Sequence, residues 1–122
     1  MDRRAVIGLI ALLVLLVPAL LLLPRYRLDG AQGVLLSIML PEDTEFAPGC
    51  SDLAFCSVRK GMTQQEVTER LGAPLVRWRR DRSSANVTWD FTRSPHSKNY
   101  RIRQIDLRNG IVVAVRSYFY VD

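Results

Sequence analysis

The N-terminal part of the chain contains an apolar run that a soluble core in a chain of 122 residues has no room to absorb. Residues 5–23 read AVIGLIALLVLLVPALLLL, without a charged or strongly polar side chain. As an α-helix this run would be roughly 28 Å long, close to the hydrocarbon thickness of a bilayer. A helix also satisfies its backbone groups internally, as hydrocarbon requires. The run therefore predicts a membrane-spanning anchor over residues 1–24.

Three interpretations of this run compete. A cleaved signal peptide normally has a shorter apolar stretch followed by a small-x-small cleavage site, whereas this run ends in Leu-Leu-Leu-Leu-Pro-Arg. A lipoprotein signal needs a cysteine directly after the apolar run, and the first cysteine is Cys50. An uncleaved anchor is favoured, with a cleaved signal and a buried helix as the alternatives.

Basic residues flank both ends of the run. Arg3 and Arg4 precede it, and Arg25, Tyr26 and Arg27 follow it, which suits the two membrane interfaces. The short basic head of an N-terminal anchor usually stays in the cytoplasm. We therefore expect a single-pass protein of the bacterial inner membrane with its C-terminal domain in the periplasm; a eukaryotic lumen is the corresponding alternative.

Two cysteines bear on this location. Cys50 and Cys56 enclose the short loop CSDLAFC and form a candidate disulfide, as a small exported domain would have. The alternative is a pair of unrelated buried thiols. No histidine lies nearby, so a zinc site is not expected.

The segment after the anchor differs in composition from the rest of the chain. Residues 25–33 are polar and contain glycine, and residues 41–49 (PEDTEFAPG) are acidic and rich in turn formers, so residues 25–50 are predicted to form a tether. Within it, residues 34–40 (VLLSIML) are apolar. We expect them to pack on the following domain, with a segment lying against lipid as the alternative.

Two short helices are predicted next. Ser51 can cap the first, which would end by Gly61. The second begins with the capping box Thr63-Gln64-Gln65-Glu66, in which the threonine hydroxyl accepts from a helical N–H and the glutamate reaches back to the cap. Gly72 is suited to a left-handed C-terminal cap, and Pro74 prevents continuation.

From Leu75 onward apolar residues alternate with a period of two, which predicts antiparallel strands. Trp78 and Trp89 share the apolar phase of their strands, so both are expected in the core. In the strand that starts at Tyr100 the phase changes, which predicts a bulge near Gln104. Asn109-Gly110 is a strong hairpin signal. Residues 51–122 are thus predicted to be an α+β domain of two short helices on a three- to four-stranded antiparallel sheet.

The helical part of this domain carries a motif with a specific spacing. Its residues are Gly61, Met62, Thr63, Glu66, Val67, Leu71, Gly72 and Pro74. With the strands that follow, this stretch resembles the SmpA/OmlA, or BamE-like, family over roughly residues 51–122. The resemblance implies a fold similar to the small domains of β-lactamase-inhibitor proteins, and a role linked to outer-membrane or envelope assembly. The best-known relatives are outer-membrane lipoproteins of the β-barrel assembly machinery; this chain differs in lacking a lipobox cysteine.

Residues typical of catalysis are sparse. His96 is the only histidine and falls in the polar loop SPHSKN, while Asp81, Asp90 and Asp106 are dispersed over separate strands. There is no phosphate loop, dinucleotide fingerprint or metal-ligand spacing. We therefore expect a protein that is not an enzyme and has no cofactor.

The remaining candidate for a functional surface is basic, in line with a formal net charge of +5. The candidate partner-binding residues are Arg77, Arg79, Arg80, Arg82, Arg101 and Arg103. If their strands are neighbours, one sheet face or edge is cationic and would dock to an envelope protein; anionic lipid headgroups are the alternative. Scattered arginines that maintain solubility and deter edge aggregation would explain the same pattern. Nucleic acid is not expected if the domain is exported.

Overall fold

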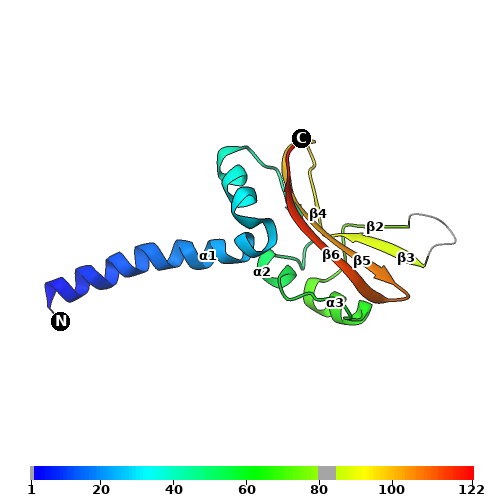
Figure 1. Ribbon diagram of the computed structural model, residues 1–122, viewed down its shortest axis with the longest axis horizontal. Helices are drawn as coiled ribbons and strands as arrows, with labels where there is room; N and C mark the ends of the chain where they lie inside the picture. The colour runs from blue at the N-terminus through cyan, green and yellow to red at the C-terminus, as the bar shows by residue number, and fades with distance from the viewer. Residues whose placement is uncertain (1, 80–84) are drawn as a thin grey trace.

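The computed structural model describes residues 2–79 and 85–122, so Arg80, Asp81 and Arg82 lie outside the described residues. The helices are α1 (Arg3–Met39), α2 (Asp52–Phe55) and α3 (Gln64–Leu71), and the strands are β1 (Glu45–Phe46), β2 (Val76–Arg79), β3 (Asn86–Asp90), β4 (Thr92–Arg93), β5 (Tyr100–Arg108) and β6 (Ile111–Tyr120). The predicted α+β class is confirmed: a long apolar N-terminal helix is followed by short helices and antiparallel strands (Figure 1).

The main sheet has the strand order β2-β3-β5-β6, with every neighbouring pair antiparallel. Asn109 and Gly110 join β5 to β6 with positive φ values of 52° and 76°, which confirms the predicted hairpin. β1 and β4 pair separately as a two-stranded sheet. Since β3 lies between β2 and β5, the strand that contains Arg77 and Arg79 is not a neighbour of the strand that contains Arg101 and Arg103.

The core lies between one face of the main sheet and helices α2 and α3. Phe55, Val67 and Leu71 of the helices are fully buried, and Trp89 and Ile105 meet them from the sheet. Removing such side chains from water is the main favourable term in folding. Helices α2 and α3 therefore cover one face of the main sheet, and they leave the opposite face uncovered.

The predicted capping of both short helices is confirmed. The Ser51 side chain accepts from the backbone N–H of Ala54. At α3, the Thr63 hydroxyl accepts from Glu66 N at 3.2 Å, while the Glu66 carboxylate accepts from Thr63 N at 3.4 Å. Gly72 ends the helix with a φ of +71°, a conformation that favours glycine.

Helix α1 differs from the sequence prediction, because it continues beyond the apolar run as far as Met39. A break at Gly30, with φ 73° and ψ 175°, divides it into two parts, which we call the first arm (residues 3–29) and the second arm (residues 31–39). The first arm projects away from the domain, and the second bends against β6 (Figure 1). The segment predicted as a tether is therefore helical over residues 25–29 and 31–39, and one side of it contacts β6.

The predicted bulge near Gln104 is wrong. The β5–β6 register is continuous from Tyr100 to Asp106 and shifts only between Asp106 and Leu107. The apparent change of phase arises because Arg101 and Arg103 lie on the same sheet face as Ile105, towards the core. Trp78 is likewise misplaced by the sequence prediction: it lies on the opposite face from Trp89 and is 47% exposed, against 3% for Trp89.

Replacing Thr63 by alanine removes the acceptor of the α3 cap, so we expect the free energy of unfolding to fall by about 1 kcal/mol. Thr68→Ala is the matched control on the same helix. Its hydroxyl donates only to the Gln64 carbonyl one turn earlier, and alanine is the better helix former, so stability should hold or rise slightly. Urea unfolding of the full-length protein in detergent, followed by tryptophan fluorescence, measures both. Equal losses would contradict this account of the cap.

Candidate functional site

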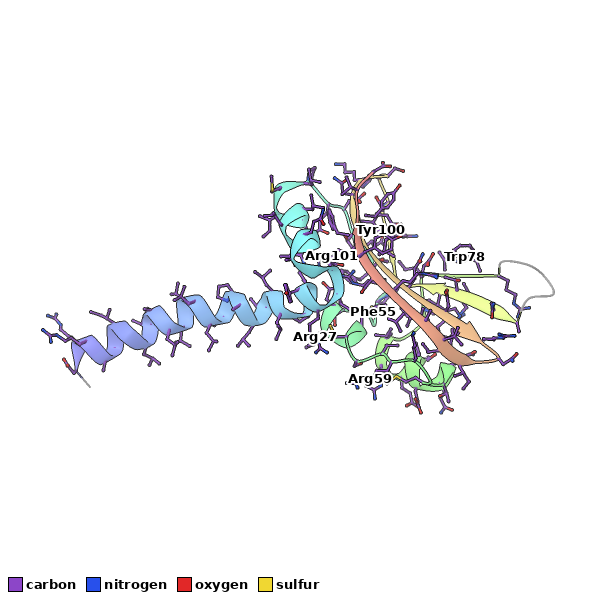
Figure 2. The ribbon with its side chains drawn as sticks, viewed as in Figure 1. Arg27, Phe55, Arg59, Trp78, Tyr100 and Arg101 are labelled. Carbon is purple, nitrogen blue, oxygen red and sulfur yellow. The ribbon has the colours of Figure 1, made fainter. Side chains whose placement is uncertain are left out.

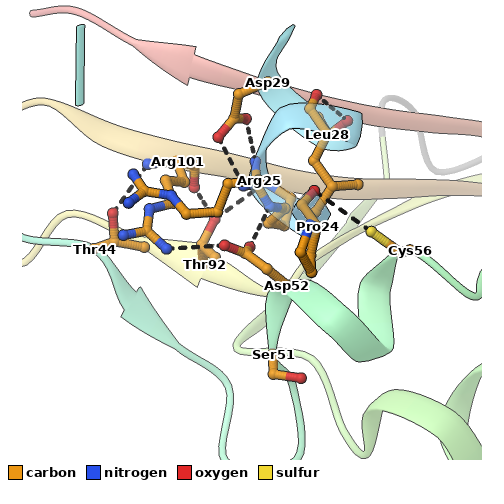
Figure 3. A network of polar contacts seen from close by, with 12 residues as sticks. Pro24, Arg25, Leu28, Asp29, Thr44, Ser51, Asp52, Cys56, Thr92 and Arg101 are labelled. Atoms are coloured by element: carbon orange, nitrogen blue, oxygen red, sulfur yellow. Dashed lines mark hydrogen bonds and ion pairs between the residues drawn. The ribbon is translucent and has the colours of Figure 1, made fainter. Parts of the chain in front are cut away.

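A buried ion pair joins helix α1 to the middle of the sheet. The side chains of Arg103 on β5 and Asp29 on α1 are both 0% exposed. The guanidinium binds the carboxylate through two contacts, Nη1 to Oδ1 at 2.7 Å and Nη2 to Oδ2 at 3.0 Å. Its Nε donates to Asp52 Oδ1 at 2.8 Å. One arginine thus connects α1, β5 and the start of α2. Figure 3 shows the surrounding contacts, with Asp29, Asp52 and Arg101 labelled.

Arg101 makes a second set of contacts beside the first. Its Nη2 and Nε bind the two oxygens of Glu42 at 2.6 and 3.0 Å, and its Nη1 donates to Asp52 Oδ2 at 2.8 Å. Asp52 therefore bridges both guanidinium groups. On the other side, Arg25 Nη2 lies 3.4 Å from Glu42 and 2.5 Å from the Ser37 hydroxyl. These contacts bind both arms of α1 to the segment that follows them.

We call these six side chains the ion-pair network. Its members are Arg25, Asp29, Glu42, Asp52, Arg101 and Arg103. Three positive and three negative groups cancel formally, which matters because a buried charge is tolerated only when paired. Burial acts to raise the pKa of Glu42, but hydrogen bonds from Arg101 and Thr44 and the charge of Arg101 hold it below its usual value.

The ion-pair network is suited to positioning rather than to proton transfer. An arginine stays protonated in proteins, and burial acts to lower the pKa of Arg103, which Asp29 and Asp52 nevertheless hold above its usual value. The carboxylates of Asp29, Glu42 and Asp52 accept the guanidinium N–H groups of Arg101 and Arg103. The ion-pair network therefore attaches the N-terminal helix to the domain.

The structure separates the predicted partner-binding arginines. The side chains of Arg101 and Arg103 are 18% and 0% exposed and belong to the ion-pair network, so they offer no surface to a partner. Arg77 and Arg79 are exposed on β2, and the Arg77 guanidinium lies 5.0 Å from the ring centre of Trp89. The condition for a single cationic face was that the two strands be neighbours, and it is not met, because β3 lies between β2 and β5.

The opposite face of the main sheet carries exposed aromatic and aliphatic side chains instead. We call it the open face, and it includes Val76, Trp78, Val113, Tyr118 and Tyr120, each 42–47% exposed. In the view of Figure 2, Trp78 lies at the end of the sheet remote from the first arm of α1, and Tyr100 lies closer to the second arm. An apolar surface of this kind, rimmed by polar groups, typically marks an interaction site.

Polar contacts hold the open face in place. The Trp78 indole N–H donates to Asp90 Oδ2 at 3.1 Å, and burial raises the pKa of Asp90 in spite of that bond. Arg116 binds Asp106 through both terminal nitrogens, at 2.6 and 2.7 Å. Because such contacts already restrict the side chains of the open face, binding a partner costs less conformational entropy.

Cys50 and Cys56 are free thiols in the structure. The Cys56 Sγ lies 3.6 Å from the carbonyl of Pro24, within hydrogen-bond distance, and the Cys50 Sγ lies 3.8 Å from the carbonyl of Ser51. Burial raises the pKa of the Cys50 thiol to about 12, so it stays protonated and unreactive at neutral pH. Residues 2–79 and 85–122 contain no cluster of His, Cys, Asp and Glu suited to a metal ion.

The apolar part of α1 meets the length and composition requirements of a membrane span, and its most apolar window is entirely unburied. A signal sequence near an N-terminus meets the same requirements. No family model matches this chain, and no curated protein or solved structure matches it either. The resemblance to the SmpA/OmlA family stays a prediction.

Sequence reasoning missed the acidic half of the ion-pair network. Asp29 and Glu42 fell in the predicted tether, and Asp52 was considered only as part of a capped helix. One signal was present in β5: Arg101 and Arg103 continue the alternation of Ile105 and Leu107 without interruption. An arginine whose position in the strand alternation faces the core needs a buried carboxylate as its partner.

Replacing Arg103 by methionine keeps the length of the side chain but leaves the Asp29 carboxylate buried without its partner. We expect the free energy of unfolding to fall by about 3–5 kcal/mol. Arg93→Met is the matched control, because Arg93 also binds a carboxylate through two contacts, to Glu45 at 2.9 Å, but is 56% exposed. Denaturant unfolding should detect no loss for the control. Similar effects in both variants would contradict a structural role for the ion-pair network.

Proposed function

We propose that this chain is a non-enzymatic envelope protein, held in the bacterial inner membrane by the first arm of α1. Its periplasmic domain binds another envelope protein through the open face. The observation that carries the proposal is the exposure of Trp78, Tyr118 and Tyr120 on an ordered sheet face. Tryptophan and tyrosine are enriched at the centres of protein interfaces, where they contribute most of the binding energy.

The ion-pair network supports an uncleaved anchor. Arg25 and Asp29 follow the apolar run directly and are bound to Glu42 and Arg103 of the folded domain. Cleavage just after the run would have to take place in a helical, ion-paired segment. A cleaved signal peptide, in contrast, normally ends in an accessible small-residue site.

The resemblance of residues 51–122 to the SmpA/OmlA family supports a role in outer-membrane or envelope assembly. That link rests on a motif of capping and packing residues, which reports the fold more directly than the function. Binding of anionic lipid through the arginines, the alternative considered from the sequence, is less well supported. Two of the arginines it requires, Arg101 and Arg103, are internal.

A photo-crosslinking amino acid placed at Tyr118 of the full-length protein tests the partner surface in bacterial cells. We expect a discrete protein adduct from position 118, reduced about tenfold by Trp78→Ala, as for loss of an interface hot spot. Position 69 on α3 serves as control, because Glu69 is equally accessible on the helical side of the molecule. The same adducts at both positions, or none at position 118, would overturn the assignment of the open face.

A further inference from the structure

The second arm of α1 exposes an apolar face. Leu35, Ile38 and Met39 are spaced i, i+3 and i+4, so they lie on one side of the helix, and they are 57%, 67% and 71% exposed. The opposite side of the arm is the packed one. There Gly33 is buried, and a Cβ built on it would lie 3.5 Å from the Phe119 Cβ.

The exposed face of the arm has no charged residue. Its other members are Ala31 and Gln32, which precede the apolar residues by one turn and are also exposed. A surface helix in water normally presents charged and polar side chains outward. This arm is apolar both towards the sheet and away from it, which indicates that its outer face has an apolar environment of its own.

The position of the arm identifies that environment. The bend at Gly30 comes seven residues after the end of the apolar run at Leu23, a helical rise of about 10 Å. The headgroup layer adds roughly 5–8 Å on each side of the hydrocarbon, so the arm begins at the outer edge of that layer. Side chains on a helix about 10–12 Å in diameter can reach back into the layer from there. Figure 1 shows the second arm turning across the direction of the first, on the side of the domain from which the first arm leaves.

We infer that the second arm lies at the headgroup region of the same bilayer that the first arm spans, with Leu35, Ile38 and Met39 directed towards the acyl boundary. This inference rests on the membrane anchoring proposed above. Helix α1 is then an anchor of two parts, one across the membrane and one on its surface. Tyr26, which is exposed near the end of the first arm, is a residue type enriched at that interface.

Fluorescence quenching in liposomes of phosphatidylethanolamine and phosphatidylglycerol tests this arrangement with the full chain. In a Cys50→Ser/Cys56→Ser background, an environment-sensitive fluorophore is attached to Ile38→Cys. Lipids carrying a spin label near the top of the acyl chain should quench it at least about twofold more than at Arg108→Cys. Arg108 is the matched control because it is exposed at the β5–β6 hairpin, far from the first arm (Figure 1).

Quenching at position 38 no stronger than at position 108 overturns the inference. Protection of position 38 from aqueous iodide without quenching by lipid also overturns it, since a protein then covers the arm. A third label at Val14→Cys separates this failure from failure of the anchor. Quenching at 14 but not at 38 leaves the span intact and removes only the surface contact; no quenching at 14 removes both.

Discussion

The guanidinium of Arg103 is fully buried, and it is paired with a carboxylate that lies 74 residues away along the chain. A charge in such a place is costly unless fixed partners surround it, so Asp29 and Asp52 must both be held at the centre of the sheet. This requirement brings the end of the first arm of α1 and the start of α2 to β5. The position of the N-terminal helix relative to the sheet depends on that contact.

The neighbouring contacts extend the same constraint. Arg101 binds Glu42, and Glu42 contacts Arg25. The segment that joins helix α1 to helix α2 is therefore attached at several points. A flexible tether would let the domain rotate freely with respect to the first arm. A helix bound by a formally neutral and largely buried set of ion pairs instead gives the domain one orientation with respect to the first arm. In that orientation the second arm lies on the side of the domain from which the first arm leaves (Figure 1).

Local features of the fold were predictable from the sequence, because their causes lie within a few residues. The capping box at Thr63, the left-handed Gly72 and the Asn109-Gly110 hairpin are of this kind. The site was not predictable in the same way. Arg101 and Arg103 alternate with Tyr100 and Ile102, a pattern that predicts a polar sheet face for the arginines. The carboxylates that make their burial possible come from remote segments of the chain.

The same reasoning explains the misplaced tryptophan. Trp78 alternates with Arg77 and Arg79, so its side chain lies on the opposite side of β2 from theirs. Whether that side faces the core is decided only by the pairing of β2 with β3. The register places Arg77 opposite Trp89 on the covered face, and Trp78 on the open one. Because β2 is an edge strand of four residues, its own pattern is too short to specify its face.

The rigid attachment of α1 to the sheet determines how the domain is oriented with respect to the first arm. Spin labels at Tyr26→Cys and Glu69→Cys, in a Cys50→Ser/Cys56→Ser background reconstituted in lipid nanodiscs, would measure it by pulsed electron paramagnetic resonance. Both positions are exposed, one on α1 and one on α3. A rigid attachment of α1 gives a single narrow distance distribution. A broad distribution, as for a domain on a flexible tether, would contradict it.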